Sequence, residues 1–88
     1  MELMGRKLRG DILWQEEVDY LAELTEPATL GGVFDQDSEK SILLRGDLVT
    51  VIAHCVLLRN GAHFDEIRVV VDSRGRVGWL WKSETRQV

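Results

Sequence analysis

The sequence contains few of the residues that cross-link a chain or anchor it in a membrane. Its 88 residues include one cysteine, Cys55, so no disulfide can form within the chain. Secreted domains of this size usually carry several disulfides, which favours a reducing compartment. No stretch reaches the ~20 apolar residues of a membrane-spanning helix. Residues 1–10 mix charged with apolar side chains and lack the hydrophobic run of a signal peptide. We therefore expect a cytoplasmic protein with no membrane contact.

An excess of positive charge is also absent. The formal net charge is −4, from 15 acidic and 11 basic residues. A chain with this balance repels a phosphate backbone unless its basic residues gather on one side, so nucleic acid is a less favoured partner. The hydrophobic share of 44% and the charged share of 30% match those of globular proteins, and the length predicts a single domain.

The residues that could carry chemistry do not combine into a site. His54, Cys55 and His63 come nearest to a metal site or a nucleophile–base pair. Adjacent strand residues point to opposite faces, so His54 and Cys55 cannot bind one metal ion, and a structural zinc needs four ligands. In the register expected below, Cys55 faces Glu66. The sequence therefore predicts no enzyme, no metal site and no cofactor, with Cys55 as a small buried apolar residue.

The strongest pattern is a series of three apolar segments separated by turn residues. Residues 47–58, 63–72 and 77–82 are rich in β-branched and aromatic side chains, with Asn60-Gly61 and Arg74-Gly75 between them. Such dipeptides between apolar runs are typical of tight hairpins. We therefore predict a mainly β fold, either a small barrel or a strongly bent antiparallel sheet, with an N-terminal arm.

The remaining segments are less regular. Residues 16–24 fit an alternating strand or a short helical face, and we favour the strand because nine residues make a marginal helix. Residues 29–41 predict a loop or a wide irregular hairpin. The expected organisation is an arm or first strand over residues 1–16, the barrel over 17–82 and a frayed tail over 83–88.

Two-residue loops at both turns would set the register of the three strands. Leu58 would then face His63, and Val70 would face Trp79. One face would form the core, with Ile52, Val56, Leu58, Ile67, Val69, Val71 and Leu80. The opposite face would hold Ala53, Cys55, Leu57, Phe64, Glu66, Arg68, Val70, Trp79 and Trp81. This opposite face is too apolar for a surface that meets only water.

Two segments resemble SH3 domains. Residues 44–51 (LRGDLVTV) resemble the hydrophobic-x-x-Gly-Asp-hydrophobic segment that follows their acidic loop, and residues 75–80 (GRVGWL) resemble their Gly-Arg-x-Gly-Trp-hydrophobic strand. The resemblance covers residues 20–81 and implies an SH3-like small β-barrel of the bacterial SH3 type. The residues of the polyproline-peptide groove are largely missing, because Phe64 lies where a tryptophan pair is expected and Trp81 follows where a proline is expected.

The tryptophan pair is the sharpest candidate for a binding site. Trp79 and Trp81 lie two residues apart on a strand and share a face, with Arg68 expected to stack across on Trp81. Exposed tryptophan and arginine are typical of interface centres. Alternatively, this face closes against the N-terminal segment around Trp14 and both tryptophans belong to the core. The candidate partner-binding residues are Trp79, Trp81, Arg68, Phe64 and Arg76.

These observations predict a non-enzymatic binding or adaptor module that contacts a protein partner or a second copy of itself. Within residues 49–58, both the odd-numbered and the even-numbered positions carry apolar side chains, so both faces of this strand should be apolar. One face packs on the core, and the other needs a second structure to cover it from water. A homodimer with Trp79 or Trp81 at or beside the interface would provide it. The alternative is a small-barrel RNA- or DNA-binding protein that uses the basic residues around the last hairpin, which are Arg74, Arg76, Lys82 and Arg86.

Overall fold

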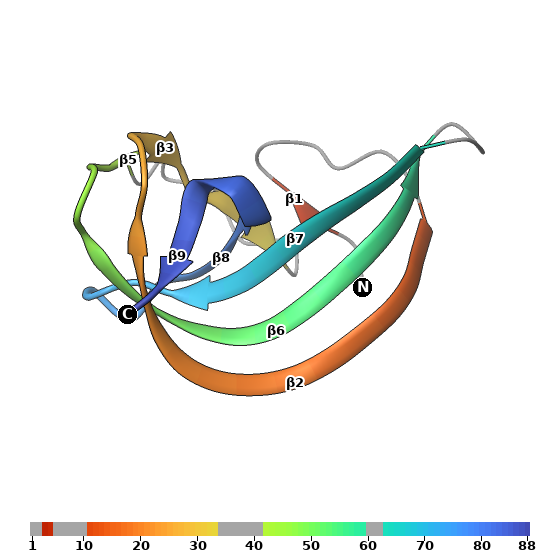
Figure 1. Ribbon diagram of the computed structural model, residues 1–88, viewed down its shortest axis with the longest axis horizontal. Coiled ribbons are helices and arrows are strands. Elements are labelled where there is room, and N and C mark those ends of the chain that lie inside the picture. Colours follow the sequence, from red (N-terminus) through yellow and green to blue (C-terminus); the bar gives the residue numbers. More distant parts are fainter. Residues whose placement is uncertain (1–2, 5–10, 34–41, 60–62) are drawn as a thin grey trace.

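A computed structural model describes residues 3–4, 11–33, 42–59 and 63–88. The elements are β1 (Leu3–Met4), β2 (Asp11–Leu24), β3 (Ala28–Thr29), β4 (Gly31–Val33), β5 (Ile42–Leu43), β6 (Leu48–Arg59), β7 (His63–Val71), β8 (Val77–Trp81), the 3-10 helix η1 (Lys82–Glu84) and β9 (Thr85–Gln87). Seven strands form one sheet in the order β1-β4-β8-β7-β6-β2-β9, and β3 pairs with β5. The sheet curls like a half-barrel (Figure 1). The mainly β prediction is confirmed.

The predicted meander is present as β6, β7 and β8, which pair as consecutive antiparallel neighbours. Residues 16–24 lie within β2, so they form a strand, and β2 crosses the boundary expected between an N-terminal arm and the barrel. The predicted turn at Asn60-Gly61 lies outside the described residues. Within the described part of the chain, no helix has the length and apolar character needed to cross a membrane.

The predicted register between β7 and β8 is wrong by one residue, because the connecting loop has three residues instead of two. The Asp72 N–H donates to the Arg76 carbonyl at 3.0 Å, and the Gly75 N–H donates to the Asp72 carbonyl at 3.1 Å. Gly75 has a φ of 79°, the left-handed conformation that closes three-residue hairpin loops. Trp79 consequently faces Val69.

The predicted register between β6 and β7 is also wrong by one residue over most of its length. Leu58 faces Phe64 instead of His63, and Cys55 faces Ile67 instead of Glu66. A shift of one residue moves a whole strand's side chains to the other face. The predicted core face of β6 is therefore corrected: Val56 and Leu58 are half-buried, while Cys55 and Leu57 are fully buried.

A β-bulge at Ile52 divides the core between the two faces of the sheet. Val51 faces Val70, whereas Ala53 faces its chain neighbour Val69. Adjacent strand residues point to opposite faces, so Val51 and Ala53 do too. The first cluster comprises Ala22, Leu24, Ala28, Leu30, Leu43, Val49, Val51, Val70 and Leu80. The second cluster comprises Ala53, Cys55, Leu57, Ile67, Val69 and Trp79.

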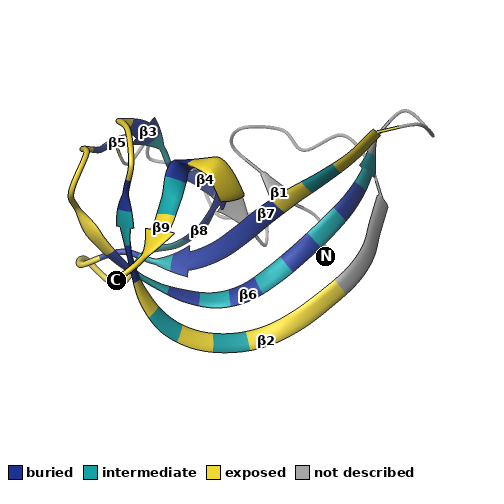
Figure 2. Ribbon diagram, in the orientation of Figure 1, coloured by how far each residue is buried: buried dark blue, intermediate teal, exposed yellow. Residues whose placement is uncertain are grey.

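The bulge changes the argument for a homodimer. Buried residues alternate with half-buried ones along β6 (Figure 2), and the odd-numbered residues 49–57 are all buried within the chain. They need no partner to cover them. Residues 67–70 of β7 are buried in succession because both faces of the sheet are covered there. Any surface for self-association must therefore lie elsewhere.

The expected frayed tail is wrong. Residues 85–87 form β9, which pairs with β2 through Glu23 and Arg86, and the Val88 N–H donates to the Leu21 carbonyl at 3.1 Å. The polar side chains of residues 83–88 predict fraying. Its backbone instead extends the sheet along the edge of β2.

Gly31 lies in β4, within the segment predicted as a loop or irregular hairpin, and fixes where Trp79 packs. The two residues are cross-strand partners. A Cβ atom on Gly31 would overlap the indole ring of Trp79, so only glycine allows the ring to lie against the β4 backbone.

Candidate functional site

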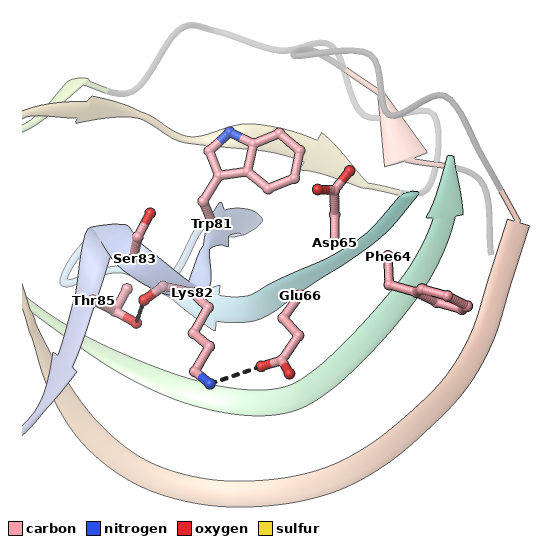
Figure 3. Close-up of a pocket in the computed structure, with 7 residues that line it drawn as sticks. All are labelled: Phe64, Asp65, Glu66, Trp81, Lys82, Ser83 and Thr85. Atoms are coloured by element: carbon pink, nitrogen blue, oxygen red, sulfur yellow. Dashed lines mark hydrogen bonds and ion pairs between the residues drawn. The ribbon is translucent and has the colours of Figure 1, made fainter. Parts of the chain in front are cut away.

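An open groove lies at the end of β8. Trp81, the last residue of β8, faces Ile67, whereas β7 begins at His63. Residues 63–66 of β7 therefore extend beyond β8. The groove has a volume of about 660 Å³ and is lined by Phe64, Asp65, Glu66, Trp81, Lys82, Ser83 and Thr85 (Figure 3). Its size is within the range of ligand-binding sites.

Two aromatic side chains give the groove its apolar surface. Phe64 is 69% exposed, which is unusual for a large apolar side chain. Trp81 is half-buried, with its ring edge-to-face against Trp79 at a centroid distance of 5.0 Å and an interplanar angle of 82°. Trp81 is thus held in place by the core, and Phe64 projects from β7 toward solvent (Figure 3).

An ion pair lines the groove on the same face of β7 as Phe64. The Lys82 ammonium lies 3.0 Å from a Glu66 carboxylate oxygen, and the Arg68 guanidinium lies 3.6 Å from the same oxygen. The hydrogen bond from Lys82 is the main cause that holds the pKa of Glu66 below its usual value. Because opposite charges are paired, this wall does not present a cluster of one sign.

A buried carboxylate caps the 3-10 helix that follows β8. The Trp81 N–H donates to the Glu84 side chain at 2.8 Å, and the Thr25 N–H donates to the Glu84 carbonyl at 3.0 Å. Glu84 is 6% exposed. These bonds stabilise η1, which follows β8 directly.

The structure separates the five residues predicted to contact a partner. Trp79 is 1% exposed and belongs to the second core cluster. Arg68 is buried, faces Leu80 instead of Trp81, and donates to the Ile67 carbonyl at 3.2 Å, so its predicted stacking on Trp81 is wrong. Arg76 lies in the turn at the opposite end of β8 from Trp81. Of the five, Phe64 and Trp81 line the groove, from opposite faces of the sheet.

The basic residues of the alternative hypothesis are also separated. Lys82 pairs with Glu66, and Arg86 Nε donates to Glu23 at 3.0 Å. Arg74 and Arg76 belong to the turn before β8, whereas Lys82 follows it, and five strand residues extend roughly 16 Å. The four side chains do not form a continuous basic surface.

The histidine and cysteine on β6 occupy structural positions. His54 Nε2 lies 2.6 Å from the Tyr20 hydroxyl, and burial, followed by the nearby Arg68, lowers the pKa of His54. Cys55 is fully buried, and burial raises the pKa of its thiol. Among the described residues, no group of three His, Cys, Asp or Glu side chains could hold a metal ion.

Sequence reasoning missed the groove itself. The sequence pattern places Ser83 and Thr85 in a frayed tail, whereas in the structure they line the groove beside Trp81. The available signal was the unequal length of the last two predicted strands, because a longer strand must extend past its neighbour.

Comparison with models of protein families, with curated proteins and with solved structures finds no match to this chain.

Proposed function

We propose that this protein is a non-catalytic binding module, built on an SH3-like small barrel, which makes protein–protein contacts through the groove beside Phe64 and Trp81. The observation that carries the proposal is the position of Phe64, 69% exposed at the rim of an open groove that the fixed ring of Trp81 also lines, from the other face of the sheet. Aromatic anchors at the centre of a surface groove supply most of the binding free energy in protein interfaces.

The polar groups of the groove support a polypeptide as the partner. Lys82 and Glu66 neutralise each other, so a ligand rich in phosphate would gain little from the site. The hydroxyls of Ser83 and Thr85 and the strand backbone of β7 offer hydrogen bonds of the kind that peptides use. Neutral polar groups around an aromatic anchor are typical of a peptide-binding surface.

Selection from a random peptide library displayed on phage would test this function. We expect the wild-type domain to enrich peptides that shift the amide NMR signals of Phe64, Glu66 and Trp81. Binding should fall at least about tenfold in Phe64→Ser, because the exposed anchor is lost. Ile42→Ser is the matched control, since Ile42 is also 69% exposed but lies on β5.

Two results would contradict the proposal. One is enrichment of peptides whose binding is equal in wild type and Phe64→Ser. The other is the absence of any enriched peptide together with binding of single-stranded nucleic acid that weakens steeply with salt, which would favour the alternative function.

A further inference from the structure

β2 leaves most of one edge of the main sheet open. β6 pairs with one side of β2, whereas β9 and the residue after it cover the other side only from Leu21 to Leu24 (Figure 1). No described strand pairs with residues 11–20 on that second side. Such an edge is a template for another strand.

The hydrogen bonds at the paired end of β2 show which backbone groups face the open side. The Leu24 N–H donates toward β6, to the Asp47 carbonyl at 3.0 Å, whereas the Leu21 carbonyl accepts from the Val88 N–H beside β9 at 3.1 Å. Along a strand, successive residues direct their N–H and C=O groups to alternate sides. Over residues 17–24, more exposed and more buried residues alternate without interruption, so this alternation holds along β2. The residues that present backbone groups to the open side are Gln15, Glu17 and Asp19.

β9 shows which side chains fit this edge. Arg86 lies opposite Glu23 and donates to its carboxylate from Nε at 3.0 Å. Glu17 and Asp19 lie on the same face of β2 as Glu23, because every second strand residue shares a face. Both are exposed, and neither has an ion pair with a described residue. The open part of the edge therefore presents carboxylates of the kind that an arginine already meets in the paired part.

We propose that the open edge of β2 binds an extended segment of a partner protein in which basic residues alternate with β-branched apolar residues. Two basic side chains would lie opposite Glu17 and Asp19. The apolar residue between them would lie beside Val18, which is half-buried on the other face of β2 and packs against the first cluster. β6 separates β2 from β7, so this site is distinct from the groove and goes beyond the proposed function.

The charges of the edge argue against a second copy of this chain as the occupant. Backbone hydrogen bonding requires odd-numbered residues to face odd-numbered residues, and antiparallel self-pairing centred on any of residues 16 to 19 then sets carboxylates directly opposite each other. Like charges in this position destabilise a sheet. The edge therefore favours a basic strand over its own copy.

Two hexapeptides of equal composition and with blocked ends test the pattern. Thr-Lys-Val-Lys-Val-Thr sets lysines opposite Glu17 and Asp19 together, whereas Lys-Val-Thr-Thr-Val-Lys lets only one lysine reach them at a time. NMR titration should show at least about threefold tighter binding of the alternating peptide, because it gains a second cross-strand charge pair. At saturation, the amide protons of Glu17 and Asp19 should exchange more slowly with solvent, while those of Glu16 and Tyr20, which point toward β6, should change little.

Charge-removing variants test the side chains. Glu17→Gln should weaken binding of the alternating peptide about threefold, and Glu17→Gln combined with Asp19→Asn should weaken it about tenfold, because each substitution removes one charge pair. Glu26→Gln is the matched control, since Glu26 is exposed but lies outside β2, and it should bind as wild type. Phe64→Ser should also bind this peptide as wild type.

Four outcomes would overturn the inference: no binding of either peptide, equal binding of both, an unchanged affinity in the double variant, or binding that leaves the exchange of the odd-numbered amides unchanged. The last would show charge attraction without strand pairing. Loss of binding in Phe64→Ser would place the lysine peptide in the groove, which would refute the edge site and support the proposed function. Failure of library peptides to bind the groove would refute the proposed function and leave the edge site standing.

Discussion

Val51 and Ala53 are two residues apart on β6, yet they pack into different hydrophobic clusters. In a regular strand they would share a face. The extra residue Ile52 reverses this, since Val51 pairs with Val70 and Ala53 pairs with Val69. One strand thereby supplies buried side chains to both faces of a curled sheet.

Deletion of Ile52 should abolish cooperative folding. Without the extra residue, β6 would pair regularly with β7 along its whole length. The β6 residues of one hydrophobic cluster would then point to the face of the sheet opposite to that cluster. Urea unfolding followed by circular dichroism would show no cooperative transition. Ile52→Val is the control, with an expected loss of about 0.5–1.5 kcal/mol because the bulge keeps its length. A deletion variant with the wild-type unfolding midpoint would show that the bulge does not set the faces.

Substitution of Gly31 by alanine should destabilise the fold by about 1–3 kcal/mol, because the added methyl group would displace the buried Trp79 ring. Thermal unfolding monitored by tryptophan fluorescence would measure the change. Gly46→Asn serves as the control: Gly46 has a φ of 88° and open space around it, and asparagine tolerates this conformation. Equal unfolding temperatures for Gly31→Ala and wild type would refute the packing described for Trp79.

The Cys55 thiol should resist alkylation in the folded protein. Burial removes access to the thiol and raises its pKa, which lowers the fraction of reactive thiolate. Iodoacetamide labelling followed by mass spectrometry should modify Cys55 only after denaturation. Cys55→Ser should cost about 1–2 kcal/mol of stability because it places a hydroxyl in an apolar cluster, and it should leave peptide binding unchanged. Loss of binding in a folded Cys55→Ser variant would contradict a purely structural role.

Stability should decrease as the pH falls below 6.5, the ordinary pKa of histidine, because of His54. Its pKa is lowered in the folded state, so below 6.5 the unfolded state takes up the proton first and is favoured. The stability difference is fully present above 6.5 and is lost as the pH falls through the lower folded pKa. Urea unfolding at pH 7.5 and 5.5 would measure it. His54→Gln should remove most of the decrease in this interval, and an unchanged decrease would assign the effect to other groups.

The local pattern of the sequence determined the strands. The β-branched segments over residues 47–58, 63–72 and 77–82 predicted β6, β7 and β8, because alternation and turn residues act over a few neighbouring positions. The same reasoning favoured a strand over residues 16–24, and β2 contains them.

Only the tertiary structure decided the register, and the register decided the site. One residue of loop length at Gly75 and one bulge at Ile52 determine which face each side chain occupies, and neither has a distinct signature in the sequence. Trp79 therefore became a core residue beside Gly31, a contact between segments far apart in the chain. The groove beside Phe64 and Trp81 lies where β7 extends past the end of β8, and the buried Glu84, in a tail expected to fray, holds η1 at its border.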